Sequence, residues 1–135
     1  MKLYYQRYPM TESTEKSADL DDLRPPLVII PGLFGSTTNL RGIAKLLGEK
    51  YPVWVIDQRN HGRSPHAPSN TYIDMCDDLL AFLDEHQLAS VVLCGHSMGG
   101  KVAMLFSLLH PERVAGLVVL DIAPITYEHL SLIHI

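Results

Sequence analysis

Short apolar runs recur along the chain and are separated by polar segments. The runs occupy residues 27–30, 53–56, 91–94 and 117–120, and none of them alternates with polar positions. Continuous apolar runs of this length are typical of strands buried on both faces of a parallel sheet. A weaker alternation over residues 2–8 predicts an additional edge strand. The pattern therefore predicts a sheet whose central strands are enclosed.

Segments with helical spacing lie between these runs. Asn39 is a candidate N-cap for the first segment, which ends near Gly48, and Thr71 with Asp74 has the spacing of a capping box at the start of the second. The third segment ends at His110, before a proline. The alternation of strands and helices predicts an α/β fold with right-handed crossovers. The apolar positions expected to face the sheet are Leu40, Ile43 and Leu47, then Ile73, Cys76, Leu80 and Leu83, then Val102, Leu105, Phe106 and Leu109.

Composition and charge narrow the possible functions. A chain of 135 residues with 47% apolar and 19% charged residues can form one domain with a buried core. Its net charge of −4 argues against nucleic acid or an anionic membrane as the main partner. The sequence has no run near the ~18 apolar residues of a membrane span, and residues 1–7 lack the apolar region of a secretory signal, so neither element is expected. Cys76 and Cys94 lack metal-ligand spacing and are typical of a reduced compartment, which predicts a cytoplasmic protein without a bound metal.

The motif Gly-x-Ser-x-Gly occupies residues 95–99, directly between an apolar run and a helical segment. This order of strand, motif and helix is the context of a nucleophile elbow. Ser97 is then expected in a sharp, strained turn, with Oγ above the carboxyl ends of the strands. Gly95 and Gly99 let the strand and helix backbones pass close together. The positive end of the helix points at the place where an oxyanion would form, so Ser97 is the predicted nucleophile.

A glycine-containing loop after the first buried run is the second candidate site. In serine hydrolases of this architecture, the loop at this position supplies one backbone N–H to the oxyanion hole, and the residue after the nucleophile supplies the other. These donors are the main-chain groups of Leu33 and Met98. The alternative interpretation of residues 31–36 is an ordinary glycine turn.

Longer stretches of the chain resemble one family. The matching stretches are Gly32–Ser36 with Asn39 and Leu40, then residues 57–65, residues 95–101 and Asp121-Ile122-Ala123-Pro124. Over residues 27–129 the chain resembles the amino-terminal half of α/β-hydrolases of the YbfF esterase type, which include mitochondrial relatives. The resemblance implies an α/β-hydrolase fold with a mostly parallel sheet. It also implies a Ser-His-Asp triad, no cofactor, and acyl esters or acyl-CoA thioesters as small-molecule substrates. Family members usually carry His where this chain has Pro31, a change expected to affect loop stiffness more than chemistry.

The resemblance also assigns the triad acid. In this family it follows the last strand of the matched region, which implies Asp121. Many other α/β-hydrolases place the acid one strand later, and Asp121 then becomes a residue that caps the next loop. Asp57 is interpreted as a loop-ordering residue near Arg59, and Cys94 as a core residue.

The triad order on this fold is Ser, acid, then His. After Asp121 the sequence contains only His129 and His134, which follow too closely for the ~10–12 residues of a βαβ crossover. Residues 1–129 are therefore interpreted as part of a hydrolase domain whose catalytic His lies elsewhere, and the chain by itself is expected to be inactive. Residues 130–135 match one reading frame of a transposase end sequence used in DNA library preparation, so we interpret them as an adapter-derived tail.

Other functions share the same motif. A carbon–carbon hydrolase of the meta-cleavage type and a cofactor-free haloperoxidase-like enzyme both use Gly-x-Ser-x-Gly, and a non-catalytic relative or inert fragment is a further alternative. Dehalogenases and epoxide hydrolases carry Asp where this chain has Ser97, so the sequence argues against both of these classes. Neither the acyl-chain preference nor the oligomeric state follows from the sequence.

Overall fold

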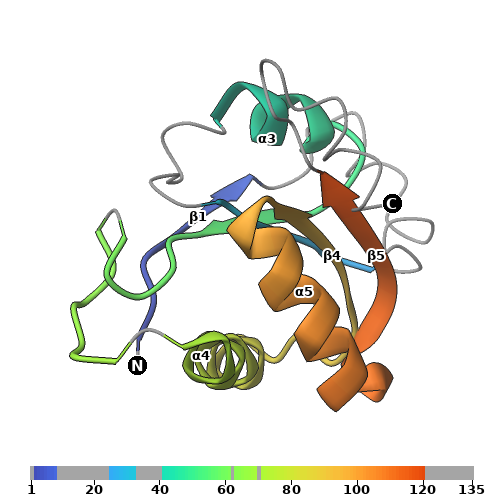
Figure 1. Cartoon of the computed structure of the whole chain (residues 1–135). Helices are drawn as coiled ribbons and strands as arrows, with labels where there is room; N and C mark the ends of the chain where they lie inside the picture. The colour runs from blue at the N-terminus through green and yellow to red at the C-terminus, as the bar shows by residue number, and fades with distance from the viewer. Residues whose placement is uncertain (1, 9–24, 33–40, 62, 70, 121–135) are drawn as a thin grey trace, which may run out of the picture.

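The computed structural model describes residues 2–8, 25–32, 41–61, 63–69 and 71–120. These residues form a five-stranded sheet with the order β1-β3-β2-β4-β5, flanked by helices (Figure 1). The elements in chain order are β1 (Tyr5–Tyr8), β2 (Leu27–Ile30), α3 (Arg41–Leu47), β3 (Val53–Ile56), α4 (Tyr72–Glu85), β4 (Val91–His96), α5 (Met98–Leu109), the 3-10 turn η1 (Pro111–Arg113) and β5 (Val114–Leu120).

Strands β2 to β5 are parallel, and β1 pairs antiparallel with β3 at one edge. This arrangement confirms the predicted α/β class and the predicted edge strand. The register aligns Ile29 of β2 with Val55 of β3 and with Cys94 of β4. Because the parallel strands run in register, their carboxyl ends meet along one edge of the sheet.

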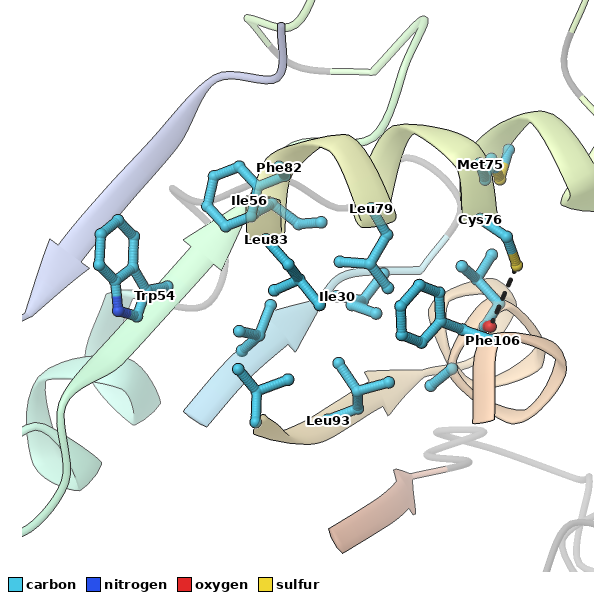
Figure 2. Packing of buried hydrophobic residues seen from close by; sticks show 14 of the residues in the cluster. Ile30, Trp54, Ile56, Met75, Cys76, Leu79, Phe82, Leu83, Leu93 and Phe106 are labelled. Carbon is cyan, nitrogen blue, oxygen red and sulfur yellow. Dashed lines mark hydrogen bonds between the residues drawn. The ribbon is translucent and has the colours of Figure 1, made fainter. Parts of the chain in front are cut away.

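Apolar side chains fill both faces of the sheet. Helices α4 and α5 cover one face, where Phe82, Phe106 and Leu93 are buried (Figure 2). A smaller cluster around Ala44 of α3 covers the other face. Strands β2 and β3 are enclosed almost throughout, as their apolar runs predict. Strand β5 was also expected to be buried on both faces, but the expectation is wrong for its middle, where Val118 is 44% exposed.

The buried face of α4 is rotated from the predicted one. The expected stripe included Ile73 and Leu80, yet Ile73 is 52% exposed and Leu80 is only partly buried. Cys76 and Leu83 of the predicted stripe are fully buried, and Met75, Leu79 and Phe82 extend the buried face to the side away from Ile73. Asp78 lies on this buried face. A helical pattern that counts every Asp as solvent-facing therefore places the face incorrectly.

The capping box at the start of α4 is confirmed. The N–H of Asp74 donates to Thr71 Oγ1 at 3.1 Å, and the N–H of Thr71 donates to Asp74 Oδ2 at 3.3 Å. Hydrogen bonds from Ser69 and from Thr71 hold the pKa of Asp74 below its ordinary value. The carboxylate therefore remains charged at the amino end of the helix, where a negative charge is favourable. No helix in the described part of the chain is long and apolar enough to cross a membrane.

Candidate active site

Ser97 forms the turn between β4 and α5 in a conformation that L-residues rarely adopt. Its backbone has φ 55° and ψ −116°, and its side chain is exposed. Such a backbone costs roughly 1–3 kcal/mol and persists only where its surroundings hold it. Here the Ser97 N–H donates to the carbonyl oxygen of Leu120 at 3.0 Å, and the Ser97 carbonyl accepts from the N–H of Gly100 at 2.9 Å. The predicted strained turn between strand and helix is therefore present.

Glycines at both sides of Ser97 allow this turn because no side chain fits there. A Cβ built on Gly99 would meet the carbonyl oxygen of Ile30 and would lie 2.6 Å from that of Pro31. A Cβ built on Gly95 would meet the carbonyl oxygen of Gly99. The backbones of β2, β4 and α5 therefore touch at this point, as the motif predicts.

The end of β2 also touches the elbow, a contact that the sequence motif alone does not reveal. A Cβ on Gly32 would lie 2.9 Å from the Cβ of Ser97 and 2.8 Å from the carbonyl oxygen of His96. Gly32, the residue directly before the candidate oxyanion donor Leu33, therefore lies beside Ser97. Leu33, the next residue, lies outside the described part of the chain.

Met98 is the first residue of α5 and is partly buried. Met98 is therefore among the residues whose N–H group has no acceptor within the helix. The 12-residue helix directs its positive end toward the serine. Asp121 lies outside the described residues. It follows Leu120, whose carbonyl binds the Ser97 N–H.

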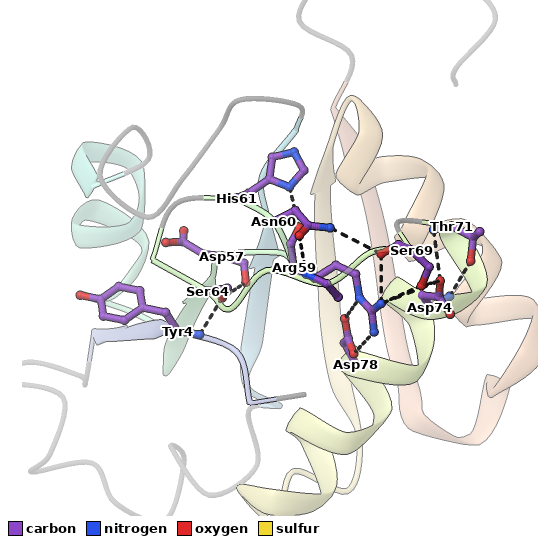
Figure 3. A network of polar contacts seen from close by, with 11 residues as sticks. Tyr4, Asp57, Arg59, Asn60, His61, Ser64, Ser69, Thr71, Asp74 and Asp78 are labelled. Atoms are coloured by element: carbon purple, nitrogen blue, oxygen red, sulfur yellow. Dashed lines mark hydrogen bonds and ion pairs between the residues drawn. The ribbon is translucent and has the colours of Figure 1, made fainter.

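The loop after β3 is closed by internal hydrogen bonds (Figure 3). The buried Asp57 carboxylate accepts from the Arg63 N–H at 3.0 Å, and the Asp57 carbonyl accepts from Ser64 Oγ at 2.5 Å. Ser64 Oγ in turn accepts from the N–H of Tyr4 at 2.7 Å, which ties the loop to the segment before β1. The loop-ordering role expected for Asp57 is confirmed, because its carboxylate binds the main chain of Arg63 within the loop.

Arg59 clamps the same loop to α4. Its Nε and Nη2 donate to the two carboxylate oxygens of Asp78 at 2.6 and 2.9 Å, and its Nη1 donates to the carbonyl oxygen of Ser69 at 3.2 Å. The Asp78 and Arg59 side chains are 3% and 12% exposed. Hydrogen bonding to Asp78 raises the pKa of Arg59 above its ordinary value. The sequence analysis did not predict this pair. The signal in the sequence is Asp78 itself, an acid among the apolar residues of α4.

The two cysteines are free and buried. Burial raises the pKa of Cys76 to about 11 and also raises the pKa of Cys94. Both thiols are therefore protonated near neutral pH and weakly nucleophilic. The core position predicted for Cys94 is confirmed. No group of His, Cys, Asp and Glu side chains in the described residues could hold a metal ion.

The strand-elbow-helix arrangement agrees with what comparison with known proteins shows. Residues 25–133 match the family of proteins with the alpha/beta hydrolase fold, and the chain belongs to this family. It is 50% identical over 109 residues to the sn-1-specific diacylglycerol lipase ABHD11 of Danio rerio, an alignment that covers 78% of this chain and 34% of that protein. It is 42% identical over 103 residues to Esterase YbfF of Escherichia coli, covering 76% of this chain and 41% of that protein.

A solved structure, that of a marine microorganism esterase, superposes with a TM-score of 0.79 at 39% identity. The superposition covers 99% of this chain and 48% of that chain. The resemblance to YbfF-type esterases and the α/β-hydrolase fold are thus confirmed. The chain spans less than half the length of these relatives.

The close approach at the elbow predicts the effect of added methyl groups. Gly99→Ala in the full-length protein would force apart the backbones of α5 and β2, so we expect little soluble folded protein. Gly42→Ala is the matched control, because nothing lies within 4 Å of a Cβ at this helical position. It should raise the free energy of unfolding by about 0.5–1 kcal/mol. Urea unfolding and soluble yield measure both effects, and a Gly99→Ala protein as stable as the wild type would contradict the packing described.

The buried ion pair predicts a large cost when one partner is removed. Arg59→Met leaves the Asp78 carboxylate buried without its cation, which should lower the free energy of unfolding by about 3–5 kcal/mol. Lys2→Met is the control, because Lys2 forms an exposed pair with Glu85 at 3.4 Å, and such pairs contribute about 0–1 kcal/mol. Urea denaturation of the full-length variants tests the contrast. Equal losses for the two variants would show that the clamp does not stabilise the fold.

Proposed function

We propose that the full-length protein is a serine carboxylic-ester hydrolase with Ser97 as its nucleophile. The observation that carries the proposal is the exposed Ser97 side chain on a strained turn at the amino end of α5. Relatives named as an esterase and as a lipase support an acyl ester as substrate. Acyl-CoA thioesters remain a second substrate class within the proposal, since the same acyl chemistry applies to them.

The reaction follows the two-step scheme of activated serines. Ser97 Oγ attacks the acyl carbon and gives its proton to a His that follows the acid in the chain order of this fold. The protonated His then transfers the proton to the leaving alkoxide, so that the alcohol departs and an acyl-enzyme remains. Water attacks the acyl-enzyme with the same His as base, and the carboxylic acid is released as Ser97 regains its proton.

Backbone N–H groups of Leu33 and Met98 are proposed to bind the oxyanion. Met98 begins α5, and Leu33 follows Gly32, which packs against Ser97. Preorganised donors of this kind typically contribute about 10²–10³-fold each to turnover.

Asp121 is proposed to orient the catalytic His. The hydrogen bond from the Ser97 N–H to Leu120 supports this role, because it brings the end of β5 to the elbow directly before Asp121 in the sequence. An acid at this position holds the His in the tautomer that can accept the serine proton.

The two free cysteines support a reducing, cytoplasmic location for the protein.

Ser97→Ala tests the nucleophile. In the full-length protein it should lower kcat for a p-nitrophenyl acyl ester by roughly 10⁴–10⁶-fold, because the acyl-enzyme can no longer form. Ser107→Ala is the control, since Ser107 Oγ donates to the Ala103 carbonyl within α5 and is not part of the site. Circular dichroism checks that both variants fold. A loss of less than tenfold for Ser97→Ala would remove Ser97 from the nucleophile role.

Asp121→Asn tests the acid. The amide would favour the wrong His tautomer, so kcat for the same ester should fall on the order of 10⁴-fold. Asp77→Asn, at an exposed position of α4, should keep wild-type turnover. If Asp121→Asn retains wild-type turnover while an Asp one strand later proves essential, the acid belongs to that later strand.

A further inference from the structure

The imidazole ring of His96 lies against Gly32, at the end of the segment that follows β2. A Cβ built on Gly32 would be 3.3 Å from His96 Nδ1, in addition to its closer contacts with the His96 carbonyl oxygen and with the Cβ of Ser97. Gly32 is buried. The main chain at this point is therefore confined by the side chain of His96 as well as by the elbow itself.

The register of the sheet explains why these residues meet. Ile30 of β2 pairs with Gly95 of β4, so the two chains run side by side up to the elbow. His96 is the last residue of β4. Because side chains alternate along a strand, the His96 ring lies on the same face of the sheet as Cys94, which packs in the cluster around α3. This is the face toward which the chain continues after Gly32, since α3 is the next helix.

The confinement of Gly32 bears directly on the candidate oxyanion donor. The Leu33 N–H belongs to the peptide group that links Gly32 to Leu33. A peptide group is planar, so the ψ angle of Gly32 sets the direction of this N–H. Glycine by itself populates a wide range of backbone angles. Contacts around Gly32 must therefore restrict the angle if the N–H is to face one point, and the His96 ring supplies one of these contacts.

We propose that His96 is a positioning residue, whose ring holds the Gly32–Leu33 peptide so that the Leu33 N–H faces the oxyanion. The proposal rests on the ester hydrolase function and on the oxyanion role of Leu33 proposed above. The ring acts through its bulk at Nδ1, and no proton transfer is involved. Because the substrate oxygen gains its charge only as the transition state forms, the loss of this contact lowers kcat and leaves KM nearly unchanged.

The test replaces the ring in the full-length protein. His96→Ala should lower kcat for a p-nitrophenyl acyl ester about 10–100-fold, less than the roughly 10²–10³-fold lost with a whole oxyanion donor, because the N–H itself remains. His96→Asn, whose amide places an atom near the position of Nδ1, should keep most of the wild-type kcat. His110→Ala is the matched control, since it removes a partly buried histidine at the other end of α5. It should leave both kcat and KM unchanged.

Two further experiments make the test independent of how well one variant folds. His96→Val suits the end of a strand but has no atom beyond Cγ, so it should show the same loss of kcat as His96→Ala. A crystal structure of the wild-type protein with a phosphonate on Ser97 gives a direct view. Its phosphonyl oxygen should accept from the Leu33 N–H, with the His96 ring against Gly32.

The outcomes separate this proposal from the proposed function. If the wild type does not hydrolyse the ester, the proposed function fails and the role of His96 fails with it. If it does, wild-type kcat in folded His96→Ala or His96→Val protein rejects only the role of His96. A folded His96→Asn protein that loses as much kcat as His96→Ala also rejects it. In the wild-type adduct, a His96 ring turned away from Gly32 rejects it whether or not the variants fold.

Discussion

The close contact between the first turn of α5 and the backbones of β2 and β4 determines the rest of the site. A helix can begin so near two strands only if the residues at the contact lack side chains, as Gly95 and Gly99 do. The approach forces Ser97 into the left-handed half of the backbone map, with φ 55°. The same geometry leaves the serine exposed and directs the helix amino end toward it. Strain, exposure and electrostatic orientation therefore have one common cause.

A second region keeps the neighbouring edge of the sheet rigid. The loop after β3 is tied to α4 through Arg59 and Asp78, and to the amino-terminal segment through Ser64 and Tyr4. A buried ion pair of this kind does not necessarily add stability relative to apolar residues, but it fixes where the loop lies. The Arg59 main-chain carbonyl also lies 2.8 Å from His61 Nδ1, so the His61 ring is held within the same loop. Rigid surroundings of this type favour precise substrate binding.

Local patterns predicted the features that local interactions determine. The apolar runs give the strands, the spacing of Thr71 and Asp74 gives the capping box, and the motif around Ser97 gives the elbow, because each depends on neighbours within a few residues. Features that depend on distant partners were missed. Asp78 is buried because Arg59, 19 residues earlier in the chain, neutralises it, and this pairing rotates the buried face of α4 away from Ile73.

The same distinction applies to the candidate site. Ser97 was identified from a motif of five residues, whereas the contact between Gly32 and Ser97 joins segments more than sixty residues apart and required the structure. The exposure of β5 also follows from sheet order and not from its own sequence, since β5 pairs only with β4 among the described strands. Leu33 and Asp121 lie outside the described residues, so their roles remain proposals from chain order and resemblance.

The geometry around Ser97 is expected to produce an activated nucleophile. Treatment of the full-length protein with a fluorophosphonate tests it directly, because an activated serine oxygen displaces fluoride and forms a stable phosphonate ester. Peptide mass spectrometry should then locate one modification, on Ser97, and its appearance should parallel the loss of esterase activity. Modification of a different residue with parallel loss of activity, or continued ester hydrolysis with Ser97 fully modified, would show that Ser97 is not the nucleophile.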